Sequence, residues 1–159
     1  MSRPVKTPLS PDYRAKIGTA AETLFAERGF DGTSLREIAE RTGVTKSLIY
    51  HYYENKEALY QAILEDGVSG VVTQVEEIAE NGEEPKTQIR AVVQVFLDAY
   101  QDAPHRFQMI QRAIDDHHSI AAVIAERWFS RAHLALQVIV AEGVRQGGFK
   151  PLPAQMVPF

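Results

Sequence analysis

Apolar side chains recur at intervals of three and four residues along most of this chain, which is the spacing of one face of an α-helix. Such runs predict helices over about residues 11–28, 34–42, 45–53, 55–80, 85–102, 104–115 and 120–146. No segment alternates polar and apolar residues in the way that a half-buried strand does. The pattern therefore predicts an all-α fold.

Polar caps and turn residues mark the ends of these helices. A side chain that can accept a hydrogen bond from the first amides of a helix precedes each of the first four, namely Ser10, Ser34, Thr45 and Asn55. Glu37 follows Ser34 at the spacing of a capping box. Gly43 is expected to take a positive φ in the turn after the second helix. Segments 81–85 and 115–119 interrupt the pattern farther along.

Composition favours an ordinary soluble protein, because 45% of the 159 residues are hydrophobic and 24% are charged. The absence of cysteine excludes disulfides and thiolate metal sites. The first residues lack the apolar core of a secretory signal, and no apolar run approaches the roughly 20 residues of a membrane span. We therefore expect an intracellular protein without a membrane partner.

Charge is distributed unevenly about a net value of −4. Residues 1–56 hold nine Lys and Arg against seven Asp and Glu, whereas the rest of the chain holds eight against fourteen. A mildly basic N-terminal end suits contact with phosphate, and an acidic remainder suits a different partner.

Residues 33–59 predict two short helices that are joined by a glycine turn and followed directly by the start of a longer helix. This is the layout of a DNA-reading helix-turn-helix, whose second helix presents hydrogen-bonding groups to the major groove. On that helix the outward positions are Thr45, Lys46, Ser47, Tyr50 and His51. Leu48, Ile49 and Tyr53 are expected to pack against the preceding helices.

Further groups near this helix can bind phosphate. The phenols of Tyr50 and Tyr52 can donate to a phosphate oxygen, and Lys56 adds charge beside the free amides that begin the fourth helix. The free amides after Thr33, at the start of the second helix, offer another phosphate seat. Short helix-turn-helix patterns also occur as plain packing units that do not bind DNA. How much of the chain resembles known DNA-binding proteins decides between packing and DNA binding.

The sequence resembles the TetR family of bacterial transcriptional regulators across about residues 12–65. The resemblance rests on Thr33, Ile38-Ala39, Gly43-Val44-Thr45, Ile49-Tyr50, Tyr52, Lys56 and Leu59, and in the preceding helix on Ala20-Ala21, Leu24-Phe25 and Gly29-Phe30. It departs from the family pattern at Tyr53, where phenylalanine is usual. Beyond residue 65 the resemblance rests only on helix order and overall size.

This resemblance implies an N-terminal three-helix DNA-binding domain over residues 10–56, with the helix-turn-helix at about residues 34–53, and a C-terminal helical bundle over residues 57–159. Members of the family are homodimers that read a near-palindromic operator in double-stranded DNA and release it when a small molecule enters the bundle. The matching positions imply DNA contacts by Thr33, Ser34, Thr45, Lys46, Ser47, Tyr50, His51, Tyr52 and Lys56. Tyr50 and Lys56 match in both residue type and position. A bacterial, cytoplasmic repressor is therefore expected.

The C-terminal bundle carries aromatic and polar side chains that can line a ligand cavity, although core packing is an alternative role for most of them. The candidates are Phe96, Tyr100, Phe107, Arg112, Trp128, Phe129 and His133. The bundle is expected to be incomplete at its C-terminus, because members of the family continue with two further helices. A truncated chain, disordered residues beyond Phe159 and a genuinely short variant are the three explanations.

Other functions are weighed against this one. His117 and His118 beside two aspartates resemble a metal site, but adjacent histidines in a loop are more often solvated, so no metal and no cofactor is expected. No spaced catalytic motif occurs, so no enzyme is expected. An activator, a regulator that answers to a protein partner and a helical small-molecule carrier that does not bind DNA remain alternatives. The combination of Lys46, Tyr50 and Lys56 favours DNA binding over the carrier.

Overall fold

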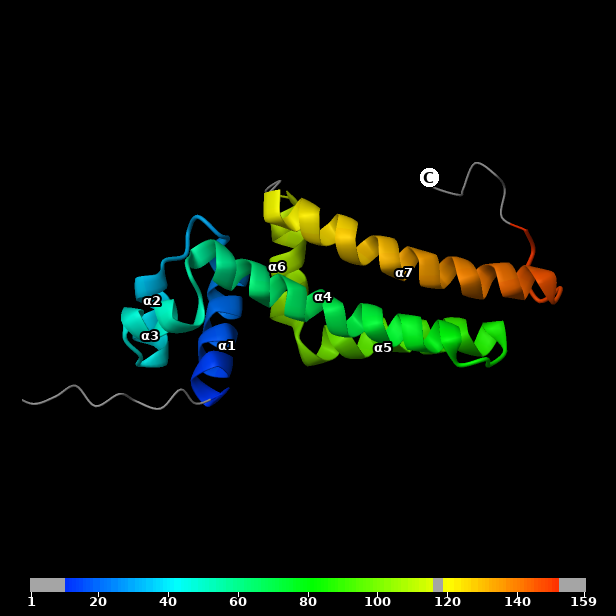
Figure 1. The fold of residues 1–159 in the computed structure, drawn as a ribbon, viewed down its shortest axis with the longest axis horizontal. Helices are drawn as coiled ribbons and strands as arrows, with labels where there is room; N and C mark the ends of the chain where they lie inside the picture. Colours follow the sequence, from blue (N-terminus) through cyan, green and yellow to red (C-terminus); the bar gives the residue numbers. More distant parts are fainter. Residues whose placement is uncertain (1–10, 116–118, 152–159) are drawn as a thin grey trace, which may run out of the picture. The chain divides into compact units, whose positions relative to one another are not determined.

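The computed structural model describes residues 11–115 and 119–151, and within those residues it consists of α-helices without a β-strand (Figure 1). The helices are α1 (Pro11–Arg28), α2 (Leu35–Thr42), α3 (Lys46–Tyr52), α4 (Lys56–Glu80), α5 (Pro85–Asp102), α6 (Pro104–Asp115) and α7 (Ser119–Arg145). The all-α prediction is confirmed, and each helix lies within about one residue of its predicted range. None of the described helices has the length and apolar character needed to cross a membrane.

The chain forms two compact units, and α4 continues from one into the other. In the described residues the first unit comprises 11–64 and 105–115, and the second comprises 65–104 and 119–151. The predicted cap Ser10 and the histidines His117 and His118 lie outside the described residues, as does the chain beyond residue 151. The division into a DNA-binding and a ligand-binding domain stays a prediction.

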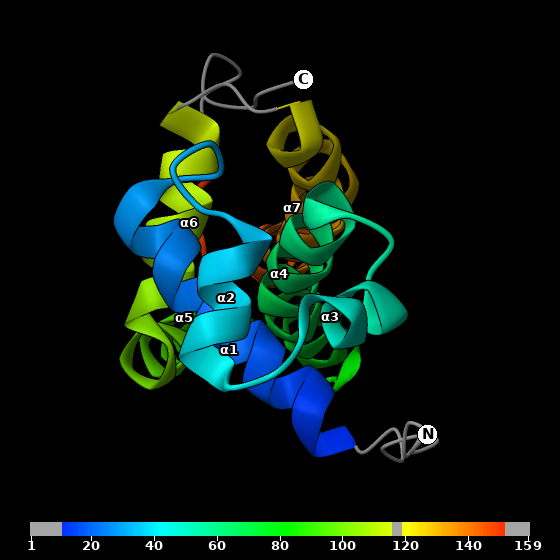
Figure 2. The ribbon, with the colours of Figure 1, turned by 90° about the vertical axis from the view of Figure 1, so that its left-hand side faces the viewer.

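The core of the first unit is built from the apolar faces of α1, α2, α3 and the first turns of α4. Figure 2 shows α2 against α1, with α3 beside α2. The large side chains on these helices that have no exposed surface are Ile17, Phe25, Ile38, Ile49 and Leu59. Phe30 folds back onto this core, since its ring centroid lies 6.1 Å from that of Phe25 and 5.0 Å from that of Tyr60. This core fixes the directions of α2 and α3.

An ion pair joins α6 to α1 within the first unit. The guanidinium of Arg106 donates to Oε2 of Glu22 from Nε at 3.2 Å and from Nη2 at 3.1 Å. The side chains of Arg106 and Glu22 are 35% and 15% exposed, so this pair is less exposed to solvent than the other ion pairs described in the unit. Met109 and Ala113 of α6 are buried. The helix is therefore an integral part of the first unit, although 40 residues of the second unit precede it in the chain.

The second unit is a bundle of α5, α7 and the later turns of α4. Val75, Val92, Ala135 and Ile139 form its buried centre. The buried amide of Gln88 donates to the carbonyl of Ile78 at 2.7 Å, which pairs a carbonyl at the C-terminal end of α4 that has no partner within the helix.

We expect the Arg106–Glu22 pair to stabilise the first unit by about 1 kcal/mol, because its partial burial reduces solvent screening. A double-mutant cycle with Glu22→Gln and Arg106→Met, measured by urea unfolding, gives this coupling energy. The matched control is a cycle on Arg36 and Glu40, whose side chains are 78% and 62% exposed. Equal coupling in both cycles would contradict the prediction.

Candidate nucleic-acid interface

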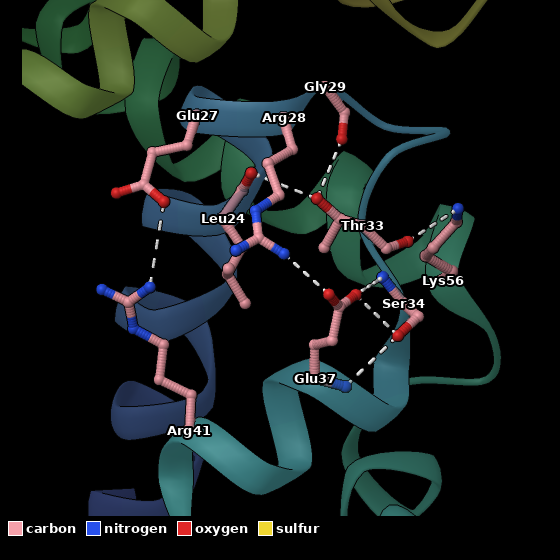
Figure 3. Close-up of polar contacts among 9 residues, drawn as sticks. All are labelled: Leu24, Glu27, Arg28, Gly29, Thr33, Ser34, Glu37, Arg41 and Lys56. Atoms are coloured by element: carbon pink, nitrogen blue, oxygen red, sulfur yellow. Dashed lines mark hydrogen bonds and ion pairs between the residues drawn. The ribbon is translucent and has the colours of Figure 1, made fainter.

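The N-terminal end of α2 is held by the predicted capping box. The hydroxyl oxygen of Ser34 accepts from the Glu37 amide at 3.2 Å, and Oε2 of Glu37 accepts from the Ser34 amide at 2.9 Å (Figure 3). Nη1 of Arg28 donates to the other carboxylate oxygen of Glu37 at 2.7 Å. The Ser34 hydroxyl and amide, with a smaller effect from Arg28, hold the pKa of the Glu37 carboxyl below its usual value. The start of α2 is thereby tied to the end of α1.

Thr33 lies on the buried side of the corner between α1 and α2, which comprises residues 29–34. Its side chain is 2% exposed, and its hydroxyl lies 3.1 Å from the carbonyl oxygen of Leu24 and 2.9 Å from that of Gly29 (Figure 3). The Leu24 carbonyl lies within α1, whereas that of Gly29 belongs to the residue after the helix, where no further turn supplies an amide. The buried hydroxyl cannot face a solvent-side ligand, so the side chain of Thr33 does not contact DNA in this arrangement.

The turn between α2 and α3 has the predicted geometry. Gly43 adopts a φ of 68° and a ψ of 23°, which is the left-handed region that glycine enters at little cost. Thr45 caps α3, because its hydroxyl oxygen accepts from the Leu48 amide at 3.2 Å. Ile49 is completely buried on the opposite side of the short helix. These constraints fix which face of α3 is directed outward.

The outward face of α3 carries the predicted reading residues. Thr45, Lys46, Ser47, Tyr50 and His51 are all exposed. Within the described part of the structure, Lys46, Ser47 and Tyr50 have no ion pair and no side-chain hydrogen bond. Tyr52 is half-buried, and its ring lies 6.0 Å from that of His51 in an edge arrangement. The structure therefore gathers five of the nine predicted contacts on one exposed segment with donor groups available.

Lys56 lies apart from this face, in the first turn of α4. Its Nζ donates to the carbonyl oxygen of Phe30 at 2.8 Å and to that of Thr33 at 3.1 Å (Figure 3 draws the second). The same nitrogen lies 4.1 Å from the centroid of the Phe30 ring. Nothing in the sequence pattern signalled these contacts, because their partners lie 26 and 23 residues earlier in the chain.

A second ion pair supports the packing of α2 on α1. Nη1 of Arg41 lies 4.0 Å from Oε2 of Glu27 (Figure 3). Neither this pair nor the Arg28–Glu37 pair was predicted from the sequence. Both link side chains on different helices, so helical spacing carries no signal for them.

The profile described as "Bacterial regulatory proteins, tetR family" matches residues 17–63, which span the helices described above. The helix-turn-helix region of the chain is of the TetR family. One relative of the chain is the transcriptional activator FasR of Mycolicibacterium smegmatis, with 29% identity over 62% of the chain and 45% of FasR. Another is the repressor KstR2 of the same organism, with 23% identity over 91% of the chain and 72% of KstR2. The chain thus spans less than half of FasR's own length.

Solved structures of TetR-like regulators share the fold of this chain. The structure of FadR from Bacillus subtilis in complex with stearoyl-CoA superposes with a TM-score of 0.73 and 20% identity, over 89% of this chain and 77% of that one. At this level of identity the comparison establishes a shared fold, which includes helices of the second unit that the family profile does not reach.

The candidate ligand residues are distributed over both units of the chain. Phe107 and Arg112 belong to the first unit, and both are half-buried. The others belong to the second unit, where Phe96, Tyr100 and Phe129 are exposed while Trp128 and His133 are half-buried. The ligand-binding assignment stays a prediction.

Two of these residues have definite neighbours in the second unit. Arg131 places its guanidinium carbon 4.6 Å from the centroid of the Trp128 ring and donates from Nε to Glu76 at 2.8 Å. This contact lowers the pKa of the Glu76 carboxyl. The His133 ring nitrogen lies 2.9 Å from the Gln137 amide nitrogen, one turn later on α7.

We expect Ser34→Ala to raise the pKa of Glu37 toward its ordinary value, because the hydroxyl and the capped geometry are its largest source of stabilisation. Loss of the N-cap should cost about 1 kcal/mol of unfolding free energy at pH 7. Since the folded-state pKa of Glu37 is lowered, its contribution is present above the unfolded-state pKa and is lost as pH falls through the folded-state value. An NMR titration of Glu37 with urea unfolding checks both effects.

Ser47→Ala is the matched control for this prediction, because it removes an exposed hydroxyl in the same unit that caps no helix. It should leave the pKa of Glu37 and the unfolding free energy unchanged. If the pKa of Glu37 is the same in Ser34→Ala as in the parent protein, the described geometry of the capping box is wrong.

Proposed function

We propose that this chain is a DNA-binding transcriptional regulator whose α3 reads the major groove of an operator. One observation carries the proposal: a short helix, fixed from behind by a buried isoleucine, presents an exposed face of hydroxyl, amine, phenol and imidazole groups. In the described residues Lys46, Ser47 and Tyr50 on this face have no ion pair and no side-chain hydrogen bond. Such a helix fits the width of the major groove and offers the donors that base edges and phosphates accept. Binding, and not catalysis, is the proposed role.

The regulator acts as a homodimer on a near-palindromic operator. A two-fold protein reads a two-fold site, so the distance between the reading helices must match the half-site spacing. A small molecule in the helical body changes that distance and releases the DNA, and repression is lifted. The effect is limited to the ligand's preference between the two states, which is typically about 1–3 kcal/mol.

Relatives support this assignment and leave one alternative to test. KstR2 is named a repressor, which supports repression, and FasR is named an activator, which supports the opposite sign. FadR was solved with stearoyl-CoA, which makes that acyl-CoA the first effector to try. The protein would perform this function in the bacterial cytoplasm, where its DNA is.

A mobility-shift titration against DNA from immediately upstream of the gene, at two salt concentrations and with competitor DNA, tests the proposal. A discrete complex that resists competitor is expected. Weak smearing that disappears at the higher salt, both here and on duplexes selected from a random library, would overturn specific binding. A promoter–reporter fusion with and without the gene then distinguishes a repressor from an activator.

We expect Tyr50→Ala to weaken operator binding by about tenfold, equivalent to about 1.4 kcal/mol, with little change in melting temperature. The reason is that the side chain is 51% exposed and has no partner in the described structure that the substitution would remove. Ile49→Ala is the contrasting variant, since it removes a fully buried side chain and should lower the melting temperature. Parental affinity in Tyr50→Ala would remove this residue from the interface.

Lys46→Met should flatten the dependence of log affinity on log salt by about 0.9, which is the signature of one lost phosphate contact. Lys86→Met is the matched control, because Lys86 is an exposed lysine of α5 in the second unit. The control should keep the parental slope. Equal slopes for the parent and Lys46→Met would show that this lysine does not contact phosphate.

A further inference from the structure

We propose that Lys56 is a positioning residue, which ties the first turn of α4 to the segment between α1 and α2 and thereby fixes the shape of the helix-turn-helix. This inference deepens the proposed function and rests on it where DNA binding is concerned. It replaces the sequence-based expectation that the ammonium of Lys56 contacts phosphate.

The contacts of the ammonium support this role. A lysine ammonium has three donor hydrogens and no acceptor. Two of its directions are occupied by the carbonyl oxygens of Phe30 and Thr33, at 2.8 and 3.1 Å. The Phe30 ring, at 4.1 Å from Nζ, covers another side of the group in a cation–π contact. In the described residues no carboxylate pairs with Lys56, so backbone dipoles and an aromatic face hold the charge.

The positions of these partners in the chain give the contact its consequence. Thr33 comes directly before the N-cap of α2, and Lys56 comes four residues after the end of α3. The bond from Nζ to the Thr33 carbonyl therefore joins the two ends of the helix-turn-helix. A closed loop of this kind restricts how far α2 and α3 can shift relative to α4.

The bond to the Phe30 carbonyl reinforces the corner from the other side. That carbonyl also accepts from the Thr33 amide at 3.3 Å, which closes the tight segment after α1. The Phe30 ring in turn packs edge-on against Tyr60 of α4, with ring centroids 5.0 Å apart. One side chain thus links the carbonyls, the ring and the first turn of α4, and a phosphate that took the place of those carbonyls would break this link.

The test compares Lys56→Met, Lys56→Arg and Lys46→Met with the parent protein. Methionine keeps the length of the stem without donors, whereas arginine restores charged donors. We expect Lys56→Met to lower the melting temperature by about 5 °C or more. At 10 °C, where it is folded, its affinity for a duplex selected by the parent from a random library should fall at least about tenfold with the parental salt slope. Lys56→Arg should recover most of both losses.

Several results would overturn the proposal. A Lys56→Met protein with the parental melting temperature and a salt slope flattened by about 0.9 would identify a phosphate contact. Parental affinity at 10 °C, despite a lower melting temperature, would reduce the role to stability alone. Failure of Lys56→Arg to recover any of the loss would also count against it, since a guanidinium offers charged donors to both carbonyls. If Lys56→Met does not fold, Lys56→Gln, whose amide offers neutral donors, takes its place in the binding assay.

Failure of DNA binding as such is distinguishable from failure of this inference. If the parent selects no duplex, the proposed function fails, and the structural half of the inference is still tested by melting and by amide hydrogen exchange. In Lys56→Met, the amides of residues 33–38 should exchange faster than in the parent, because the corner that they follow is released. Unchanged exchange there would overturn the tie between α4 and this corner.

Discussion

The C-terminal end of α1 sets the constraint on which the helix-turn-helix depends. The last carbonyls of a helix have no partner within it, and a buried carbonyl left unpaired is costly. Past this end, Thr33 places a buried hydroxyl against the carbonyl of Gly29, the residue after α1, and against that of Leu24 within the helix. Ser34 follows Thr33 directly and caps α2. The contacts that hold Thr33 therefore also place the start of α2. The angle between α1 and α2 therefore follows from hydrogen bonding as well as from apolar packing.

Some charged side chains of the first unit hold the fold together, and others face outward, where DNA can contact them. Arg28, Glu37 and Lys56 direct their charges at partners within the corner, whereas Lys46 directs its charge outward from α3. A reading helix must leave its donors free until DNA arrives, so its own position has to come from elsewhere. Here it comes from Ile49, from the Thr45 cap and from the turn at Gly43. The free face of α3 therefore depends on contacts made behind the helix and at its N-terminal end.

This division explains how far the sequence could predict the structure. Caps, glycine turns and helix ends were predictable, because the capping box at Ser34 and the turn at Gly43 depend on residues three or four positions apart. The contact of Thr33 with the Leu24 carbonyl and the contacts of Lys56 were not, because they depend on carbonyls nine or more residues away that only the fold brings near. The candidate ligand residues stay undecided for a related reason. An aromatic residue such as Phe96 shows the same helical spacing whether it packs in a core or lines a cavity.

The position of Lys56 as the first residue of α4 bears on how a signal could reach the reading helix. A displacement of this turn acts on the chain directly after α3 through the backbone, and on the residue before α2 through the Thr33 carbonyl. Both ends of the helix-turn-helix are thus moved by one element. Packed elements joined at both ends shift as a body more readily than they change their internal shape. A switch built in this way would alter where the reading face lies and leave its set of donors intact.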